Sequence, residues 1–208
     1  DKNIDVVYVD GWEPLQKSKK AIGENVGQEK SAKSKLMRFV RANFFIPDAR
    51  VFWAKAASKS VLKMHTKTPF DVLITSGPPH SMHLVGLRMK KECDIHWIAD
   101  FRDPWVGFFQ NKSLPMAKGA KCNHEKLQMR VLETANRVVV TAPSLAKEFE
   151  KHAKAVSVFT NGYEKLSANA SSQKTAMVYA GSLKAQQNPK FLWESISELT
   201  KEKSDFAN

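Results

Sequence analysis

The stretch FDVLITSGPPHSMHLVGLRMKKECDIHWIADFRDPW, residues 70–105, decides the fold. It opens with an apolar run at 70–75 that is rich in β-branched residues and stops at a Gly-Pro-Pro turn, a pattern typical of a buried strand. Apolar residues on one side of the next segment, about 80–91, predict a helix, and a second apolar run at 95–99 predicts another strand. Two strands joined by one helix form a right-handed βαβ unit, so we predict a parallel sheet.

Polar loops follow both strands of this unit. The first loop contains Ser76, Gly77, Pro78 and His80, and the second contains Asp100, Arg102, Asp103 and Trp105. Ligands of open parallel sheets bind beyond the carboxyl ends of the strands. Because both loops lie at that edge, we expect them to form the functional site. His83 follows His80 by three residues and shares its side of the helix, so it is expected to face the same cleft.

The remaining segments continue the alternation of strands and helices. Strands are predicted at 4–9, 137–141 and 156–159, helices at 51–64, 123–134 and 144–151, and loops at 16–35 and 108–121. Asp48 is placed to cap the helix that begins at 51, and Ser144 to cap the helix that follows it. We therefore predict an α/β fold, a three-layer Rossmann-like domain with a mainly parallel sheet over residues 1–163.

A second, smaller unit is expected after this domain. Residues 164–174 are small and polar, which is the composition of a linker. A short strand at 177–180 and a helix at 189–201 then follow within residues 175–208. One strand and one helix cannot bury a core of their own, so we expect this unit to be the start of a truncated second domain.

Composition and charge limit the function classes. The chain has 208 residues, of which 42% are hydrophobic and 26% charged, so it is long enough and apolar enough to bury a core. Its two cysteines, Cys93 and Cys122, lack the spacing of a disulfide framework or a zinc site, which favours a cytoplasmic protein. The net charge of +12 predicts an anionic partner: a nucleotide diphosphate, nucleic acid or an acidic membrane surface.

Residues 36–46 mix bulky apolar side chains with cations. Such a segment is able to lie on an anionic bilayer. The alternative is a surface helix whose apolar side packs on the sheet.

Four strings occur in a fixed order along the chain: TSGPPHSMHLVG, WIADFRDPW, TNGYE from Thr160, and YAGSL followed by Asn188-Pro189. Together they resemble the amino-terminal half of glycosyltransferase family 4, particularly a bacterial branch that makes surface polysaccharides, over about residues 45–199. The resemblance implies half of a GT-B fold and a retaining transferase that needs no metal or other cofactor. Its partners would be a nucleotide-sugar donor and a saccharide or lipid-linked acceptor, met in the cytoplasm at the inner membrane face.

The resemblance also implies roles for particular residues. Catalysis would fall to Arg102, Asp103 and Asp100, substrate binding to Ser76, Gly77, Pro78, His80, His83, Trp105, Asn161 and Gly162, and donor-phosphate binding to Gly181, Ser182 and Lys184. Because arginine stays protonated, Arg102 would hold an anion or polarise a hydroxyl rather than act as a base. The alternative is that Asp-x-Arg-Asp-Pro is a turn held by its own ion pair.

Other functions are possible on the same residues. A basic α/β protein that binds nucleic acid fits the charge, although no recognised binding motif is present. A hydrolase is disfavoured because the chain lacks a Gly-x-Ser-x-Gly elbow. Zinc at His80 and His83 is disfavoured because no third ligand is spaced near them. With most of the donor site beyond this chain, we expect the 208 residues alone to be inactive.

Overall fold

The computed structural model describes residues 4–12, 32–107, 114–162, 179, 181 and 188–202. The chain divides into two compact units, residues 1–162 and 163–208. In the second unit the structure describes one helix, α7 (Lys190–Glu202), which agrees with the helix predicted at 189–201. The predicted linker lies outside the described residues, as does the predicted strand at 177–180 apart from Tyr179.

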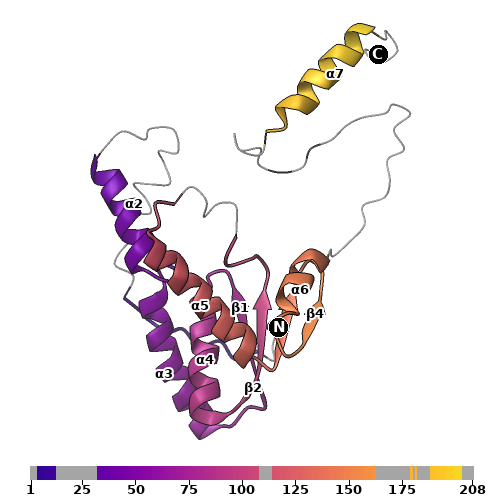
Figure 1. The fold of residues 1–208 in the computed structure, drawn as a ribbon. Helices are drawn as coiled ribbons and strands as arrows, with labels where there is room; N and C mark the ends of the chain where they lie inside the picture. The colour runs from indigo at the N-terminus through magenta and orange to yellow at the C-terminus, as the bar shows by residue number, and fades with distance from the viewer. Residues whose placement is uncertain are drawn as a thin grey trace. The chain divides into compact units, whose positions relative to one another are not determined.

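The first unit is built on a four-stranded parallel sheet (Figure 1). Its strands are β1 (Val72–Gly77), β2 (His96–Phe101), β3 (Arg137–Val140) and β4 (Val156–Val158), and they pair in chain order, β1-β2-β3-β4. The predicted α/β class and parallel sheet are confirmed, and the fold is consistent with a Rossmann-like three-layer domain, of which the described residues show the sheet and the helical layer on one face. Since the register pairs Gly77 with Phe101, the loops after β1 and β2 leave the same edge side by side.

Helices α4 (Met82–Cys93), α5 (Lys118–Thr134) and α6 (Pro143–Phe149) connect successive strands. Strands that advance in one direction through right-handed crossovers place all their connecting helices on one face of the sheet. The core agrees with this placement of the helices. In it, α5 and α6 bury Leu132 and Phe149 against the sheet residues Trp97 and Val138. On the opposite face of β1, Val72 and Ile74 are exposed.

A glycine allows α4 to pack closely on the sheet. Gly86 lies against the indole of Trp97, which is fully buried. The Nε1 atom of Trp97 donates a hydrogen bond of 2.9 Å to Thr75 Oγ1 on β1. The strand sequence therefore fixes the ring, and the helix sequence leaves room for it.

Two further helices among the described residues precede the sheet. α2 (Ala32–Phe44) contacts α5, and α3 (Val51–Lys67) packs beside α4, where Ala54 and Ala57 join Val85 and Met89 in a second apolar cluster. The expectation that the apolar side of residues 36–46 packs on the sheet is wrong, since Leu36, Phe39 and Phe44 are exposed. Within the described parts of the chain, no helix has the length and apolar character needed to cross a membrane.

The structure corrects several local predictions. Residues 4–9 form no strand, because no described strand pairs with them and the carbonyl of Val9 accepts a side-chain hydrogen bond of 2.8 Å from Trp53 Nε1 instead. The predicted loop at 108–121 ends early, since α5 begins at Lys118 and the amide of Ala117 donates to Asn43 Oδ1 on α2.

The third correction concerns Ser144, which does not cap α6. The cap position is Ala142, and Pro143 begins the helix, where its fixed φ suits the first turn. Of the loop predicted at 16–35, residues 32–35 belong to α2 and the others lie outside the described residues.

Candidate functional site

The loops that follow β1 and β2 are tied together at the carboxyl edge of the sheet. The amide of Arg102 donates to the carbonyl of Gly77 at 3.0 Å, and its guanidinium Nη2 donates to the carbonyl of Pro78 at 2.6 Å. The hydroxyl of Thr141, after β3, donates to the carbonyl of Arg102 at 2.9 Å. Three consecutive strand ends are thus joined through one residue.

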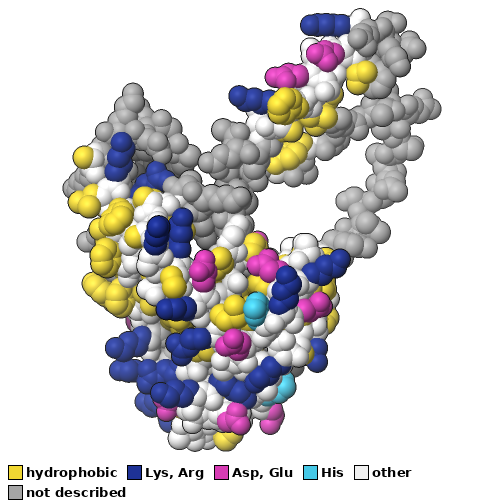
Figure 2. All heavy atoms as spheres, viewed as in Figure 1, with side chains coloured by type: hydrophobic (Ala, Val, Ile, Leu, Met, Phe, Trp, Pro, Cys, Tyr) yellow, Lys and Arg dark blue, Asp and Glu magenta, His cyan; other side chains and the backbone are white. Residues whose placement is uncertain are grey.

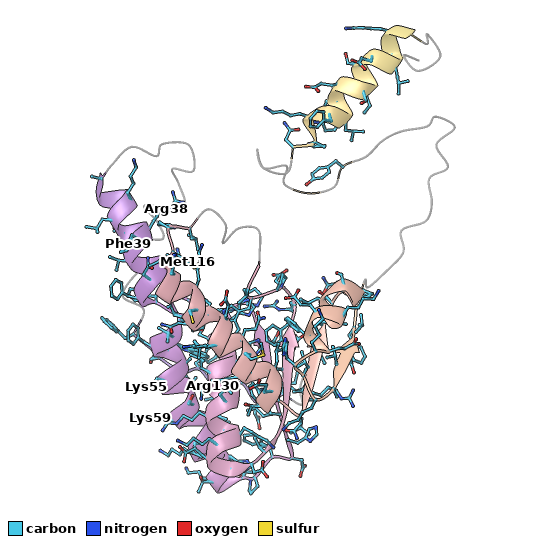
Figure 3. All side chains as sticks on the ribbon, viewed as in Figure 1. Arg38, Phe39, Lys55, Lys59, Met116 and Arg130 are labelled. Carbon is cyan, nitrogen blue, oxygen red and sulfur yellow. The ribbon has the colours of Figure 1, made fainter. Side chains whose placement is uncertain are left out.

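A pocket of about 210 Å³ lies next to this junction. Four of the predicted site residues line it: Pro78, His80, Asp103 and Trp105. The rest of its wall comes from elements that sequence reasoning had left out of the site, including Arg41, Phe45, Asp48, Met116 and His124. Met116 lies where the end of α2 meets the start of α5 (Figure 3).

The imidazole of His80 stacks on the indole of Trp105, with ring centroids 5.1 Å apart and planes 6° from parallel. Burial lowers the pKa of His80 to about 4; Asp48 opposes this decrease and His124 adds to it. His80 is therefore neutral at physiological pH. A neutral imidazole is able both to donate and to accept a hydrogen bond, which suits a hydroxyl-bearing ligand.

His83 lies beneath the pocket, fully buried and stacked on Phe101 with centroids 4.4 Å apart. Its Nδ1 is 2.9 Å from Thr75 Oγ1, which also accepts a hydrogen bond from Trp97 Nε1. The Thr75 hydroxyl has one proton and a second acceptor lone pair, so the tautomer of the His83 ring decides which of the two groups donates. Burial, reinforced by His80, lowers the pKa of His83 to about 3.

Two ring nitrogens near Gly77, His80 Nδ1 and His83 Nε2, have no hydrogen-bond partner among the described residues. A Cβ atom on Gly77 would lie 3.0 Å from the first and 2.8 Å from the second. The glycine at the end of β1 therefore leaves space between the two histidines. A larger residue would push at least one ring away from the pocket floor.

Asp48 joins the helices on either side of the pocket. Its carboxylate accepts hydrogen bonds of 2.8 Å from both the amide and the hydroxyl of Ser81, the residue before α4, and one of 2.9 Å from the amide of Arg50. The prediction that Asp48 caps α3 is wrong. Arg50 is the N-cap residue of α3, and no side chain makes a capping hydrogen bond there. Asp48 instead holds the beginning of α4, and with it His80, in place.

The α5 side of the pocket is organised by two polar residues one turn apart. Trp105 Nε1 donates to His124 Nδ1 at 3.0 Å, and the amide of Val106 donates to Gln128 Oε1 at 2.8 Å. Burial lowers the pKa of His124, and Asp48 opposes that decrease. Sequence reasoning had assigned His124 no role; the i, i+4 spacing of His124 and Gln128 on one helix side was the available signal.

The three predicted catalytic residues do not form one cluster. Arg102 and Asp103 line a second pocket of about 470 Å³ with Thr141, Ser144 and Glu148, and Asp103 borders both pockets. Asp100 points to the other face of β2, where Ser76 Oγ donates to its Oδ2 at 2.6 Å. The alternative of a turn held by its own ion pair is wrong, because within the described residues Arg102 pairs with neither aspartate.

Of the remaining predicted residues, the structure places Asn161 and Gly162 in the first unit. Asn161 and Gly162 are exposed beyond β4 and line neither pocket. Gly181, at φ +146°, belongs to the second unit. Ser182 and Lys184 lie outside the described residues.

The donor set of the pocket is one of hydrogen-bonding groups rather than metal ligands. Among the residues that the structure describes, no three His, Cys, Asp or Glu side chains are grouped to hold a metal ion. What the arrangement offers a ligand is the imidazoles of His80 and His124, the carboxylates of Asp48 and Asp103, the guanidinium of Arg41 and a largely apolar wall. No family model, no curated protein and no solved structure matches the chain.

Proposed function

We propose that this chain is part of a retaining glycosyltransferase that moves a sugar from a nucleotide-sugar donor to a lipid-linked or saccharide acceptor in surface polysaccharide synthesis. The observation that carries the proposal is the pocket at the carboxyl edge of the sheet, where His80, stacked on Trp105, is uncharged. A sugar offers hydroxyls for such an imidazole and C–H faces for an apolar wall. The resemblance of the sequence strings to glycosyltransferase family 4 supports the same function.

In this proposal the two pockets have different tasks. The pocket at His80 holds the acceptor, and the pocket at Arg102 faces the diphosphate that leaves with the nucleotide. Asp103 borders both pockets and so is placed to contact the acceptor hydroxyl close to the reacting sugar. Arg102 contributes a fixed positive charge where negative charge grows in the transition state.

The proposal places the protein in the cytoplasm, at the inner face of the membrane. A lipid-linked acceptor is presented there, and the net charge of +12 favours an anionic surface. The resemblance assigns donor-phosphate binding to Gly181, Ser182 and Lys184, which belong to the second unit.

Replacing Arg102 tests the catalytic part of the proposal. In the longer chain that carries the complete donor-binding unit, Arg102→Ala is expected to lower sugar transfer at least about tenfold, a loss of roughly 1.4 kcal/mol of transition-state stabilisation. Arg102→Lys should recover only part of the rate, since the planar fork that donates to Pro78 is lost. Steady-state transfer rates, measured with folding checked by circular dichroism, give the comparison.

The matched control is Arg137→Ala, an exposed arginine at the amino end of β3. It bonds Ser157 at 2.7 Å, away from both pockets, so the transfer rate should not change. Equal losses for the two variants, or full activity of Arg102→Ala, would show that the chemistry lies elsewhere.

Binding of nucleic acid is the second candidate function, favoured by the net charge of +12. This function predicts an affinity for nucleic acid that depends strongly on salt concentration and does not change when pocket residues are replaced. If the chain binds single- or double-stranded DNA or RNA tightly at physiological salt, and transfers no sugar in its longer form, this candidate replaces the first.

A further inference from the structure

The hydrogen bond between Trp105 and His124 has a fixed direction. Trp105 Nε1 donates to His124 Nδ1 at 3.0 Å, and the two ring centroids lie 6.5 Å apart with the planes at 90°. An indole N–H is a donor only, whereas an imidazole nitrogen accepts only while it carries no proton. His124 Nδ1 is therefore unprotonated, and the neutral ring of His124 carries its proton on Nε2.

Protonation of His124 removes this bond. Both nitrogens of an imidazolium are donors, so two N–H groups would face each other across 3.0 Å. The indole cannot accept in exchange, because its nitrogen has no lone pair free for a hydrogen bond. Trp105 is 1% exposed, and a buried N–H that loses its acceptor is costly, so the indole has to move to reach another acceptor or water.

The indole of Trp105 is part of the pocket wall. It stacks on the imidazole of His80, with ring centroids 5.1 Å apart, and both rings line the pocket. The backbone beside it is held separately, because the amide of Val106 donates to Gln128 Oε1 at 2.8 Å and a glutamine amide does not titrate. Loss of the His124 bond therefore frees the side chain of Trp105 while the loop stays attached to α5.

Solvent protons reach His124, because its ring is half-buried and lines the pocket. Burial lowers the pKa of His124 below the ordinary value of 6.5, and the Asp48 carboxylate opposes this decrease. On the face drawn in Figure 2, the densest group of Lys and Arg side chains lies over α3 and α4, away from the beginning of α5. The elements packed around His124 also carry Arg41 on α2, His80 just before α4, His83 and Arg88 on α4, Asp103 after β2, and Lys121 on α5.

We propose that His124 is a proton-sensitive latch on Trp105: the neutral ring holds the indole against His80 and completes the pocket, and the protonated ring releases the indole and opens that wall. The released imidazolium is attracted by the Asp48 carboxylate. The latch regulates the acceptor pocket, so its biological meaning rests on the proposed function. Acceptor binding is then strongest above the pKa of His124 and weakens as the pH falls through it.

NMR of the indole N–H signals in the isotope-labelled 208-residue chain tests the latch without a ligand. The Trp105 Nε1–H signal, assigned by its absence from Trp105→Phe, should shift and lose protection from solvent exchange between about pH 7.5 and about pH 5.5. Its midpoint should coincide with that of the carbon-bound ring protons of His124. The ring protons of His80 should shift at the same midpoint, because the stacked indole contributes a ring current to them.

Two internal controls accompany this titration. His80 has a pKa of about 4, so it stays largely neutral down to about pH 5.5 and its shift reports the indole rather than its own protonation. Trp97 Nε1–H donates to the Thr75 hydroxyl, which does not titrate. Its signal should stay unchanged and shows that the domain is folded.

His124→Asn separates the latch from other effects of acid. The Oδ1 atom of asparagine takes the place of Nδ1 as acceptor and does not titrate, so the Trp105 signal should stay in its bonded position throughout. His124→Leu, which has no acceptor, should show the released signal at every pH. The matched control is His65→Asn, because half-buried His65 also accepts through Nδ1, from the amide of Phe70 at 3.3 Å, and lines neither pocket. It should titrate as the parent does.

Three results would each overturn the proposal. The first is a Trp105 signal in the parent that does not follow the titration of His124, and the second is a signal in His124→Asn that moves as in the parent. The third is loss of the Trp97 signal together with that of Trp105, since the domain would then unfold as a whole. If the Trp105 signal behaves as stated but the longer chain transfers no sugar, the proposed function fails and the latch stands.

Discussion

Replacing Gly86 by alanine is expected to cause the largest loss of stability among simple substitutions in this domain. The added Cβ would overlap atoms Cε2, Cζ2 and Nε1 of Trp97, a ring that is fully buried. Either α4 moves off the sheet or the indole turns and loses its hydrogen bond to Thr75. Overpacking of this kind costs about 3 kcal/mol, which lowers the melting temperature by roughly 6–12 °C in a domain of this size.

Gly119→Ala provides the control for this experiment, because a Cβ at that position in the first turn of α5 meets no atom within 4 Å. Alanine is the better helix former, so this variant should be unchanged or up to about 1 kcal/mol more stable. Urea denaturation followed by tryptophan fluorescence measures both variants. An unchanged midpoint for Gly86→Ala would mean that α4 packs on β2 less closely than the structure has it.

Mild acid is expected to lower the free energy of unfolding of the domain, with His83 as the main cause. In the unfolded chain His83 takes up a proton below its ordinary pKa of 6.5, but in the folded protein its pKa is about 3. Between these two pKa values the unfolded chain binds more protons than the folded protein. The free energy of unfolding therefore has its full value above about pH 6.5 and decreases as the pH falls toward 3. At about pH 5 the loss from His83 alone is about 2 kcal/mol, and His80 adds to it in the same direction.

His83→Gln isolates this effect. The glutamine amide is able to accept the Thr75 hydroxyl but does not titrate, so the fall in stability from about pH 7.5 to about pH 5 should shrink by about 2 kcal/mol. The exposed His152 offers a matched substitution, His152→Gln, which should leave the slope of the parent unchanged. Equal pH dependence in all three proteins would show that protonation of His83 does not oppose folding.

The central βαβ unit was predictable because its signals are local. A β-branched run, a glycine-proline stop and a helical apolar side each report on neighbours a few residues away, and β1, α4 and β2 lie within two or three residues of the predicted bounds. β1 and β2 extend to Gly77 and Phe101, past the predicted ends, because the two strands continue to pair there.

The site was only half predictable because its other wall comes from distant parts of the chain. The bonds between Asp48 and Ser81 span 33 residues, and the Asn43 bond that starts α5 spans 74. No periodicity or motif reports such contacts. The strand predicted at residues 4–9 was wrong for a related reason. Their alternating pattern is typical of a strand, but a strand forms only where a second strand pairs with it.

The chain-order pairing of the four strands has a consequence for how the protein is made. Each new strand joins the one that left the ribosome just before it, so every sheet contact closes a loop of only tens of residues. Loop-closure entropy grows slowly with length, by about 0.6 kcal/mol per doubling, and the successive closures are therefore similar in difficulty. The sheet is able to grow by one strand at a time during synthesis, without waiting for a distant segment to return.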